Sequence, residues 1–140
     1  MITIRPYDTD DEQEVLALWE RSEITRHWND AARDIARKLR VQSEWFLVGL
    51  FAEGIVATVM AGYDGHRGWI NYLAVDPAYR RQGLGRAMMK EAELRLLEFG
   101  CPKINLLIHK DNVDAIAFYK GIGFCEDDVV CVGKRLLPNA

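Results

Sequence analysis

The stretch RRQGLGRAMMKEAE, residues 80–93, places two glycines one residue apart where a long helix is expected to begin. The backbone N–H groups of a helix's first turn lack an intrahelical partner and lie at the positive end of the helix dipole. Gly83 and Gly85 have no side chains that would keep a ligand away, and glycine readily adopts positive φ. Three basic side chains surround them: Arg80, Arg81 and Arg86. This composition and position predict a phosphate site built from the amides of residues 81–86.

The two glycines alone do not identify the ligand. The dinucleotide pattern G-x-G-x-x-G requires a third glycine at the position of Met88, and the G-K-[ST] end of a P-loop does not follow. A tight turn that binds nothing is the competing interpretation of Gly83 and Gly85.

A second set of residues that could do chemistry lies in the later segment NVDAIAFYKGIGF. Asn112 and Tyr119 are seven residues apart, about two helical turns, so they share one face of a helix. Ala115 lies between them and is small, which leaves room for a ligand. The alternative for Tyr119 is a packing role beside Phe118.

The composition argues against several classes of function. The net charge of −3 disfavours general nucleic-acid binding, the apolar runs are too short for a membrane span, and the first residues do not form a signal peptide. We therefore expect a cytoplasmic protein. Cys101, Cys125 and Cys131 form no C-x-x-C pair and are expected to be reduced thiols. The histidines lie far apart in the sequence, so we expect no metal site.

Hydrophobic periodicity predicts the elements that position these residues. Strands are expected at 2–6, 45–51, 54–63, 69–75, 103–109 and 129–136, with a tight turn at Glu53-Gly54. Helices are expected at 9–23, from about residue 30 to 39, at 83–99 and at 112–120. The phosphate site would therefore lie between a strand and the helix that follows it.

The order of these elements is β-α-α-β-β-β-α-β-α-β, which indicates one α/β domain of the α+β kind over residues 1–140. We expect a mixed, partly antiparallel sheet of about six to seven strands with about four helices. The strand–helix–strand unit from residue 69 to 109 should be a right-handed parallel crossover.

Taken together, these motifs resemble the GNAT superfamily of acyl-CoA-dependent N-acetyltransferases. The resemblance rests on the R-x-x-G-x-G motif of Arg80, Gly83 and Gly85, on the preceding strand end YLAV, and on the segment NVDAIAFYKGIGF. The predicted order of elements matches the GNAT fold over nearly the whole chain. The segments TVMAGYDGHRG, GCPKI and GKRL are most similar to the small bacterial YpeA-type acetyltransferases.

The resemblance implies that acetyl-CoA is the co-substrate. The coenzyme A pyrophosphate would be bound by Arg80, Arg81, Gln82, Gly83, Leu84, Gly85 and Arg86. The strand before this loop would bulge and part from its neighbour, so that Leu73, Ala74 and Val75 bind the pantetheine arm and the Val75 amide donates to the thioester carbonyl. Asn112 would contact the same arm, and Tyr119 would protonate the departing thiolate.

The implied reaction is direct attack of a primary amine on the thioester in a ternary complex, without a covalent enzyme intermediate. The strands expected at 69–75 and 103–109 contain no Glu or Asp that could act as the general base. A water relay polarised by Asp64, His66, Tyr72 or His109 is the alternative.

Four residues are candidates for the acceptor side: Trp28, Asn29, Asp64 and His66. In GNAT proteins the segment between the first two helices often forms a wall of the acceptor site, and the Trp28 ring could receive a cationic amine. Each candidate also has a structural interpretation, because Asn29 or Asp30 can cap a helix and DGHRG is ordinary turn material.

We therefore expect acetyl transfer to a small-molecule or peptide amine, with no nucleic-acid or membrane partner and with a homodimer as one option for the assembly. A non-catalytic acyl-CoA-binding sensor is the alternative function. A structural domain whose glycines only form turns is a third. The sequence does not select the amine.

Overall fold

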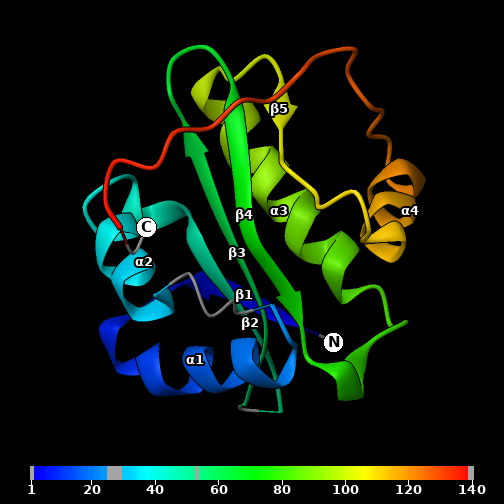
Figure 1. The fold of residues 1–140 in the computed structure, drawn as a ribbon. Helices are drawn as coiled ribbons and strands as arrows, with labels where there is room; N and C mark the ends of the chain where they lie inside the picture. Colours follow the sequence, from blue (N-terminus) through cyan, green and yellow to red (C-terminus); the bar gives the residue numbers. More distant parts are fainter. Residues whose placement is uncertain (1, 25–29, 53, 139–140) are drawn as a thin grey trace.

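The computed structural model describes residues 2–24, 30–52 and 54–138, and its centre is a five-stranded sheet in the order β1-β2-β3-β4-β5 (Figure 1). The strands are β1 (Thr3–Pro6), β2 (Phe46–Phe51), β3 (Gly54–Tyr63), β4 (Gly68–Val75) and β5 (Ile104–Asn105). Strands β1 to β4 form antiparallel pairs, whereas β4 and β5 pair in parallel. This mixed sheet confirms the predicted fold class.

Helices cover both faces of the sheet. The helices are α1 (Glu12–Arg21), α2 (Ala31–Lys38), α3 (Leu84–Phe99) and α4 (Val113–Gly121), with short 3-10 turns η1 (Thr9–Asp11), η2 (Ser43–Trp45) and η3 (Pro77–Tyr79). Figure 1 shows α1 and α2 on one side of the sheet, α3 on the other, and α4 beyond α3 at the edge. Among the helices that the structure describes, none combines the length and apolar character that crossing a bilayer would require.

Two apolar cores form because successive side chains of a strand point to opposite faces. The core between the sheet and α3 contains Leu47, Val59, Ile70, Met88, Met89 and Leu96. The core between the sheet and the first two helices contains Val15, Leu18, Trp19, Ile35, Phe46, Val48 and Met60. The sheet is therefore packed on both of its faces.

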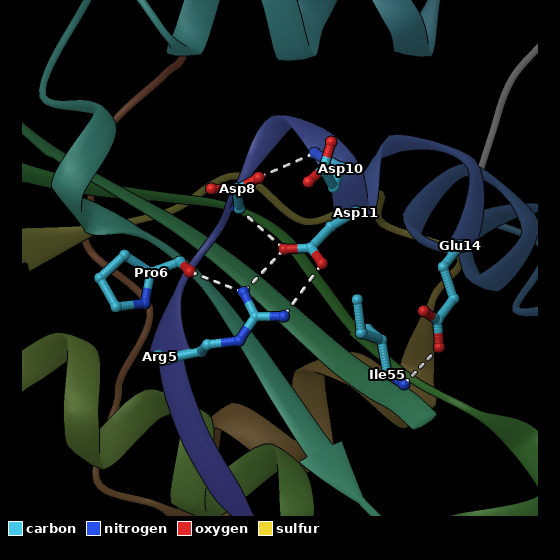
Figure 2. Close-up of polar contacts among 7 residues, drawn as sticks. All are labelled: Arg5, Pro6, Asp8, Asp10, Asp11, Glu14 and Ile55. Atoms are coloured by element: carbon cyan, nitrogen blue, oxygen red, sulfur yellow. Dashed lines mark hydrogen bonds and ion pairs between the residues drawn. The ribbon is translucent and has the colours of Figure 1, made fainter. Parts of the chain in front are cut away.

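Charged groups fix the start of the chain to the sheet, as Figure 2 shows. The Arg5 guanidinium donates to both carboxylate oxygens of Asp11, at 2.7 and 3.0 Å, and this pairing holds the pKa of Asp11 below its ordinary value. The Asp8 N–H donates to the same carboxylate at 2.8 Å. The Ile55 N–H donates to Glu14 at 2.6 Å, which ties α1 to β3. The acidic start of α1 thus has tertiary partners as well as a favourable helix dipole.

The sheet is smaller than the sequence predicts. No strand forms at 129–136, where Val129, Val130 and Val132 are 76%, 87% and 86% exposed. The strand expected at 103–109 is reduced to the two residues of β5. An alternating apolar pattern forms a strand only where an edge offers a ladder of partners, and so short an edge offers little of one. The C-terminal segment instead meets this edge through the Asp127 carboxylate, which accepts from Lys103 and Asn105 at 2.7 Å each.

Candidate active site

The N-terminus of α3 has no side-chain cap. Gly83 occupies the N-cap position with φ +77°, and Arg81 also has a positive φ of +65°. The first intrahelical bond runs from the Ala87 N–H to the Gly83 carbonyl at 3.0 Å. The N–H groups of residues 84–86 therefore lie at the helix end without an intrahelical acceptor, which suits them to bind an anion.

The two glycines of this loop meet different requirements. A Cβ at Gly83 would meet no atom within 4 Å, so the requirement there is the left-handed backbone. A Cβ at Gly85 would lie 3.1 Å from Phe118 Cζ and 3.7 Å from Val75 Cγ2, so the requirement there is space. Gly85 thus allows α4 and the end of β4 to approach the first turn of α3.

The polar side chains around this helix end are exposed: Arg80, Arg81, Gln82 and Arg86. Within the described residues, neither Arg81 nor Arg86 forms an ion pair. The Asp76 carboxylate, at the start of the loop, is paired with Arg21 at 2.9 Å and also accepts from the Ala78 N–H at 2.9 Å. The positive charge of the loop is therefore available to an incoming anion.

β4 and β5 pair only where they begin. The parallel register joins Gly68 to Ile104 and Trp69 to Asn105, and beyond these two pairs the strands separate. Figure 1 shows the chain after β5 turning away from β4 towards α4. Among the residues that the structure describes, no strand pairs with this edge of β4 over its second half.

The register with β3 shows which amides face this gap. The Asp76 N–H donates to the Val56 carbonyl at 2.8 Å, so Asp76 directs its N–H towards β3. Successive residues of an antiparallel strand alternate between the two edges, so the Ala74 N–H also faces β3. The N–H groups of Leu73 and Val75 then face the gap.

β4 also carries the bulge that the sequence resemblance implies. Thr58 pairs with Ala74 and Met60 with Asn71, so two residues of β4 stand opposite one residue of β3. The first of these two residues, Tyr72, has a positive φ of +52°. A bulge therefore lies directly before the amides that face the gap.

Asn112 and Tyr119 both lie at α4, beside this gap. The Asn112 side chain caps the helix by accepting from the Ala115 N–H at 3.1 Å. The Tyr119 ring is half-buried and packs edge-on against Phe118 and Phe124, with centroids 5.1 and 5.5 Å apart. Burial raises the pKa of Tyr119 to about 12, and its hydroxyl has no hydrogen-bond partner among the described residues. Tyr119 is thus a protonated donor without an internal acceptor.

A broad groove of about 1610 Å³ opens beside Tyr119, between α3, the chain after β5 and the C-terminal segment. The residues lining it do not include the loop at 81–86. The start of α3, the end of β4 and α4 meet instead at Gly85, beside Val75 and Phe118.

Of the four acceptor candidates, the structure describes two. Trp28 and Asn29 lie outside the described residues. Asp64 and His66 lie in the turn between β3 and β4, at the end of β4 far from the α3 loop (Figure 1). Asp64 accepts from two backbone amides of this turn, at 2.8 and 2.7 Å, and these bonds lower its pKa to about 2. The geometry gives Asp64 a structural role in the turn.

The structure also shows a polar network behind the bulge that the sequence does not predict. Of its residues, the sequence indicates only Tyr72, as a candidate for a water relay. The Trp19 indole donates to the Thr58 hydroxyl at 2.8 Å, and that hydroxyl donates to the Tyr72 carbonyl at 2.9 Å. The Tyr72 hydroxyl donates to the Asp34 carboxylate at 2.6 Å. These residues come from four different elements, so no spacing along the chain could have grouped them. A polar Thr58 inside an apolar strand is the one signal available.

Comparison with known proteins identifies the family. The profile of the Acetyltransferase (GNAT) family matches residues 8–124. The chain belongs to the GNAT family. An acetyltransferase from Sodalis glossinidius is 44% identical over 137 residues, covering 97% of this chain and 96% of that protein. An uncharacterised N-acetyltransferase from Yersinia pestis is 42% identical over 136 residues, with 97% and 96% coverage. The predicted family is therefore confirmed, and the protein is an acetyltransferase; the narrower YpeA-type resemblance stays a prediction.

Solved structures of other GNAT enzymes have the same fold as this acetyltransferase. A ribosomal-protein alanine N-acetyltransferase from Escherichia coli superposes with a TM-score of 0.77 at 26% identity, covering 91% of this chain and 79% of that chain. An aminoglycoside 6'-N-acetyltransferase from Acinetobacter haemolyticus also has a TM-score of 0.77, at 21% identity, with 96% and 99% coverage.

The residues of this acetyltransferase fit an acyl-CoA. The uncapped end of α3, with its open space above Gly83 and its exposed arginines, suits a diphosphate. The amides of Leu73 and Val75 suit an extended arm laid along β4. In the part of the chain that the structure describes, no three His, Cys, Asp or Glu side chains are grouped so as to hold a metal ion.

Proposed function

We propose that this acetyltransferase takes its acetyl group from acetyl-CoA and transfers it to a primary amine by direct attack in a ternary complex. One observation carries the proposal: the uncapped N-terminus of α3 lies beside the unpaired edge of β4. The helix end offers amides to a diphosphate, and the strand edge offers amides to an extended amide-containing arm.

The loop before α3 binds the pyrophosphate. The amides of residues 84–86 are free at the helix end, and those of residues 81–83 complete the proposed site. Arg80, Arg81 and Arg86 add charge that no other described residue neutralises through an ion pair. Asn112 uses its oxygen to cap α4, so its exposed amide group is the part left to contact the pantetheine arm. Leu73 and Val75 bind that arm along β4, whereas the Ala74 amide, which the sequence also assigned to the arm, faces β3.

The acetyl thioester supplies an activated carbonyl, and the protein's own groups prepare it for attack. The Val75 amide faces the gap and donates to the carbonyl oxygen, where negative charge develops. Removing such a donor typically costs about 100–1000-fold in rate. The Tyr119 pKa of about 12 keeps the hydroxyl protonated at neutral pH. Because a thiol ionises at roughly 8.5, the thiolate is a weaker base than tyrosinate, and Tyr119 stabilises the departing sulfur chiefly by donating a hydrogen bond to it.

The amine must reach the carbonyl in its neutral form. β4 and β5 contain no carboxylate that could remove its proton, so an ordered water does so. Trp28 and Asn29 are the leading candidates for the acceptor wall, because they directly precede α2, which contacts the bulge through Asp34. Asp64 and His66 are the weaker candidates.

The acceptor is a small molecule or a peptide. One structural relative is named as acetylating an alanine of a ribosomal protein, and another is named as acetylating an aminoglycoside, which is a small molecule. The site is built from one chain, and a homodimer is a further prediction. We also place the activity in the cytoplasm, where the three cysteines, all free in the structure, would be kept reduced.

Calorimetry with coenzyme A and an acceptor screen test the proposal. The wild type is expected to bind coenzyme A and to acetylate at least one member of a panel of polyamines, aminoglycosides, amino acids and N-terminal peptides, as detected by mass spectrometry. Tyr119→Phe should bind coenzyme A normally but turn over slowly, whereas Tyr63→Phe, the same exchange at another half-buried tyrosine, should match the wild type. Binding without turnover on any amine would favour the acyl-CoA sensor. If the wild type does not bind coenzyme A at millimolar concentration, the third alternative, a structural domain whose glycines only form turns, would be favoured.

A further inference from the structure

The bulge in β4 begins with a residue that does not favour its conformation. Tyr72 has φ +52°, which lies in the left-handed region. Where the first residue of a bulge is left-handed, it is normally a glycine. A side chain with a Cβ is strained there, so the bulge persists only if surrounding contacts hold it.

Three side chains hold Tyr72, and we call them the Tyr72 clamp: Trp19, Thr58 and Asp34. The Thr58 hydroxyl donates to the Tyr72 carbonyl at 2.9 Å and accepts from the Trp19 indole N–H at 2.8 Å. The Trp19 ring stacks on the Tyr72 ring with centroids 4.1 Å apart. Asp34 accepts from the Tyr72 hydroxyl at 2.6 Å. Trp19 and Thr58 are both 0% exposed, so water does not compete for the bond between them.

The bulge decides which amides face the gap between β4 and β5. If the pairing of Met60 with Asn71 continued without the extra residue, Thr58 would face Leu73 instead of Ala74. A shift of one residue reverses the direction of every following N–H and side chain. The Leu73 and Val75 amides would then turn towards β3, and Ala74 would face the gap.

We propose that Thr58, Trp19 and Asp34 are positioning residues for acetyl transfer: by holding Tyr72 in its left-handed bulge, they aim the Leu73 and Val75 amides at the acetyl-CoA thioester. The inference rests on the proposed function. Because Asp34 belongs to α2, the clamp also fixes β4 relative to the helix that follows the acceptor candidates Trp28 and Asn29.

Thr58→Val is the sharpest test, because it keeps the shape of the side chain and removes only the hydroxyl. It leaves the Trp19 indole and the Tyr72 carbonyl without a buried partner, which favours the regular register. We expect kcat to fall by about 100-fold, the cost of a misplaced reacting group. Coenzyme A affinity should hardly change, since the pyrophosphate binds at the α3 loop. Thr58→Ser, which keeps the hydroxyl, should restore most of kcat.

Controls separate this role from a merely structural one. Thr3→Val makes the same exchange at an exposed position of β1 and should leave kcat and coenzyme A affinity unchanged. Tyr72→Phe removes only the bond to Asp34 and should give a smaller loss of kcat than Thr58→Val. Wild-type kcat in Thr58→Val, or an equal loss in Thr58→Ser, would overturn the proposal.

Amide hydrogen exchange followed by NMR in the free protein tests the clamp even if the proposed function fails. In the wild type the Leu73 N–H should exchange quickly, because it faces the gap. In Thr58→Val it should become protected by a bond to β3. Unchanged Leu73 exchange in a folded Thr58→Val variant contradicts the clamp, whereas absent coenzyme A binding in the wild type contradicts the proposed function.

Discussion

A Cβ placed on Gly85 would stand 3.1 Å from the ring of Phe118, so α4 can approach the first turn of α3 this closely because Gly85 has no side chain. Phe118 in turn packs against Tyr119, with ring centroids 5.1 Å apart. One glycine therefore sets the distance between the loop proposed to bind the pyrophosphate and the tyrosine proposed to donate to the departing sulfur.

Gly85→Ala is expected to impair activity more than stability. Alanine suits a helix better than glycine by about 1 kcal/mol, which offsets the strain of pushing the Phe118 ring aside. The displaced α4 should carry Tyr119 away from the thioester and lower kcat by roughly 10-fold. Thermal unfolding and steady-state kinetics on the same preparation check both parts. A Tm far below that of the wild type with normal kcat per folded molecule would contradict this explanation.

Gly83→Ala should behave differently, because Gly83 is required for its backbone conformation. Alanine in the left-handed region costs about 1–2 kcal/mol, or the loop rearranges to avoid it. In either case coenzyme A should bind more weakly, as calorimetry can measure. Gly65→Ala is the matched control, since Gly65 also has a positive φ (+93°) and open space but lies in the β3–β4 turn. It should lose similar stability and keep coenzyme A affinity; equal weakening in both variants would contradict a specific role for Gly83.

The pH dependence of turnover should reflect the raised pKa of Tyr119. A tyrosine with the ordinary pKa of 10.0 would lose its proton and slow the reaction as the pH approached that value. Because burial raises the Tyr119 pKa to about 12, kcat should rise as the amine deprotonates and then stay level up to about pH 10.5. Tyr119→Phe should have the same profile at a lower level. A falling limb near pH 10 that disappears in Tyr119→Phe would show that Tyr119 titrates normally.

Local features of the site were predictable because they depend on neighbours in sequence. Gly83 and the helix start at Leu84 follow from loop composition and helix periodicity, and the two-turn spacing predicts that Asn112 and Tyr119 share α4. The need for space at Gly85 was not predictable, because Phe118 approaches it from another helix. The Tyr72 clamp joins α1, α2, β3 and β4, so only the folded chain brings it together.

The strand expected at residues 129–136 is an element that was predicted but does not form. The pattern of residues 129–136 suits a strand, but a strand also needs an edge in register, and β5 offers only Ile104 and Asn105. Periodicity reports what a segment can do once it is paired. It contains no information about whether the partner edge is long enough.

The ion pair at the start of the chain should make stability depend on acid pH. Arg5 holds the pKa of Asp11 below its unfolded value, so the carboxylate stabilises the fold fully above that unfolded value, near 3.8, and loses the contribution as the pH falls through the lower folded pKa. Asp11 is 8% exposed and also accepts from the Asp8 N–H. Asp11→Asn should therefore lower the free energy of unfolding by about 1.5–3 kcal/mol at neutral pH, as for a hydrogen bond to a charged group.

The difference between wild type and Asp11→Asn should shrink as the pH falls below about 4, because the wild-type carboxyl is then protonated too. Urea denaturation at several pH values measures this difference. Asp10→Asn removes a carboxylate one residue away that is exposed and accepts no hydrogen bond from Arg5, so it should change stability little at any pH. A constant difference between wild type and Asp11→Asn across the acid range would mean that Asp11 contributes through the shape of the η1 turn and not through its charge.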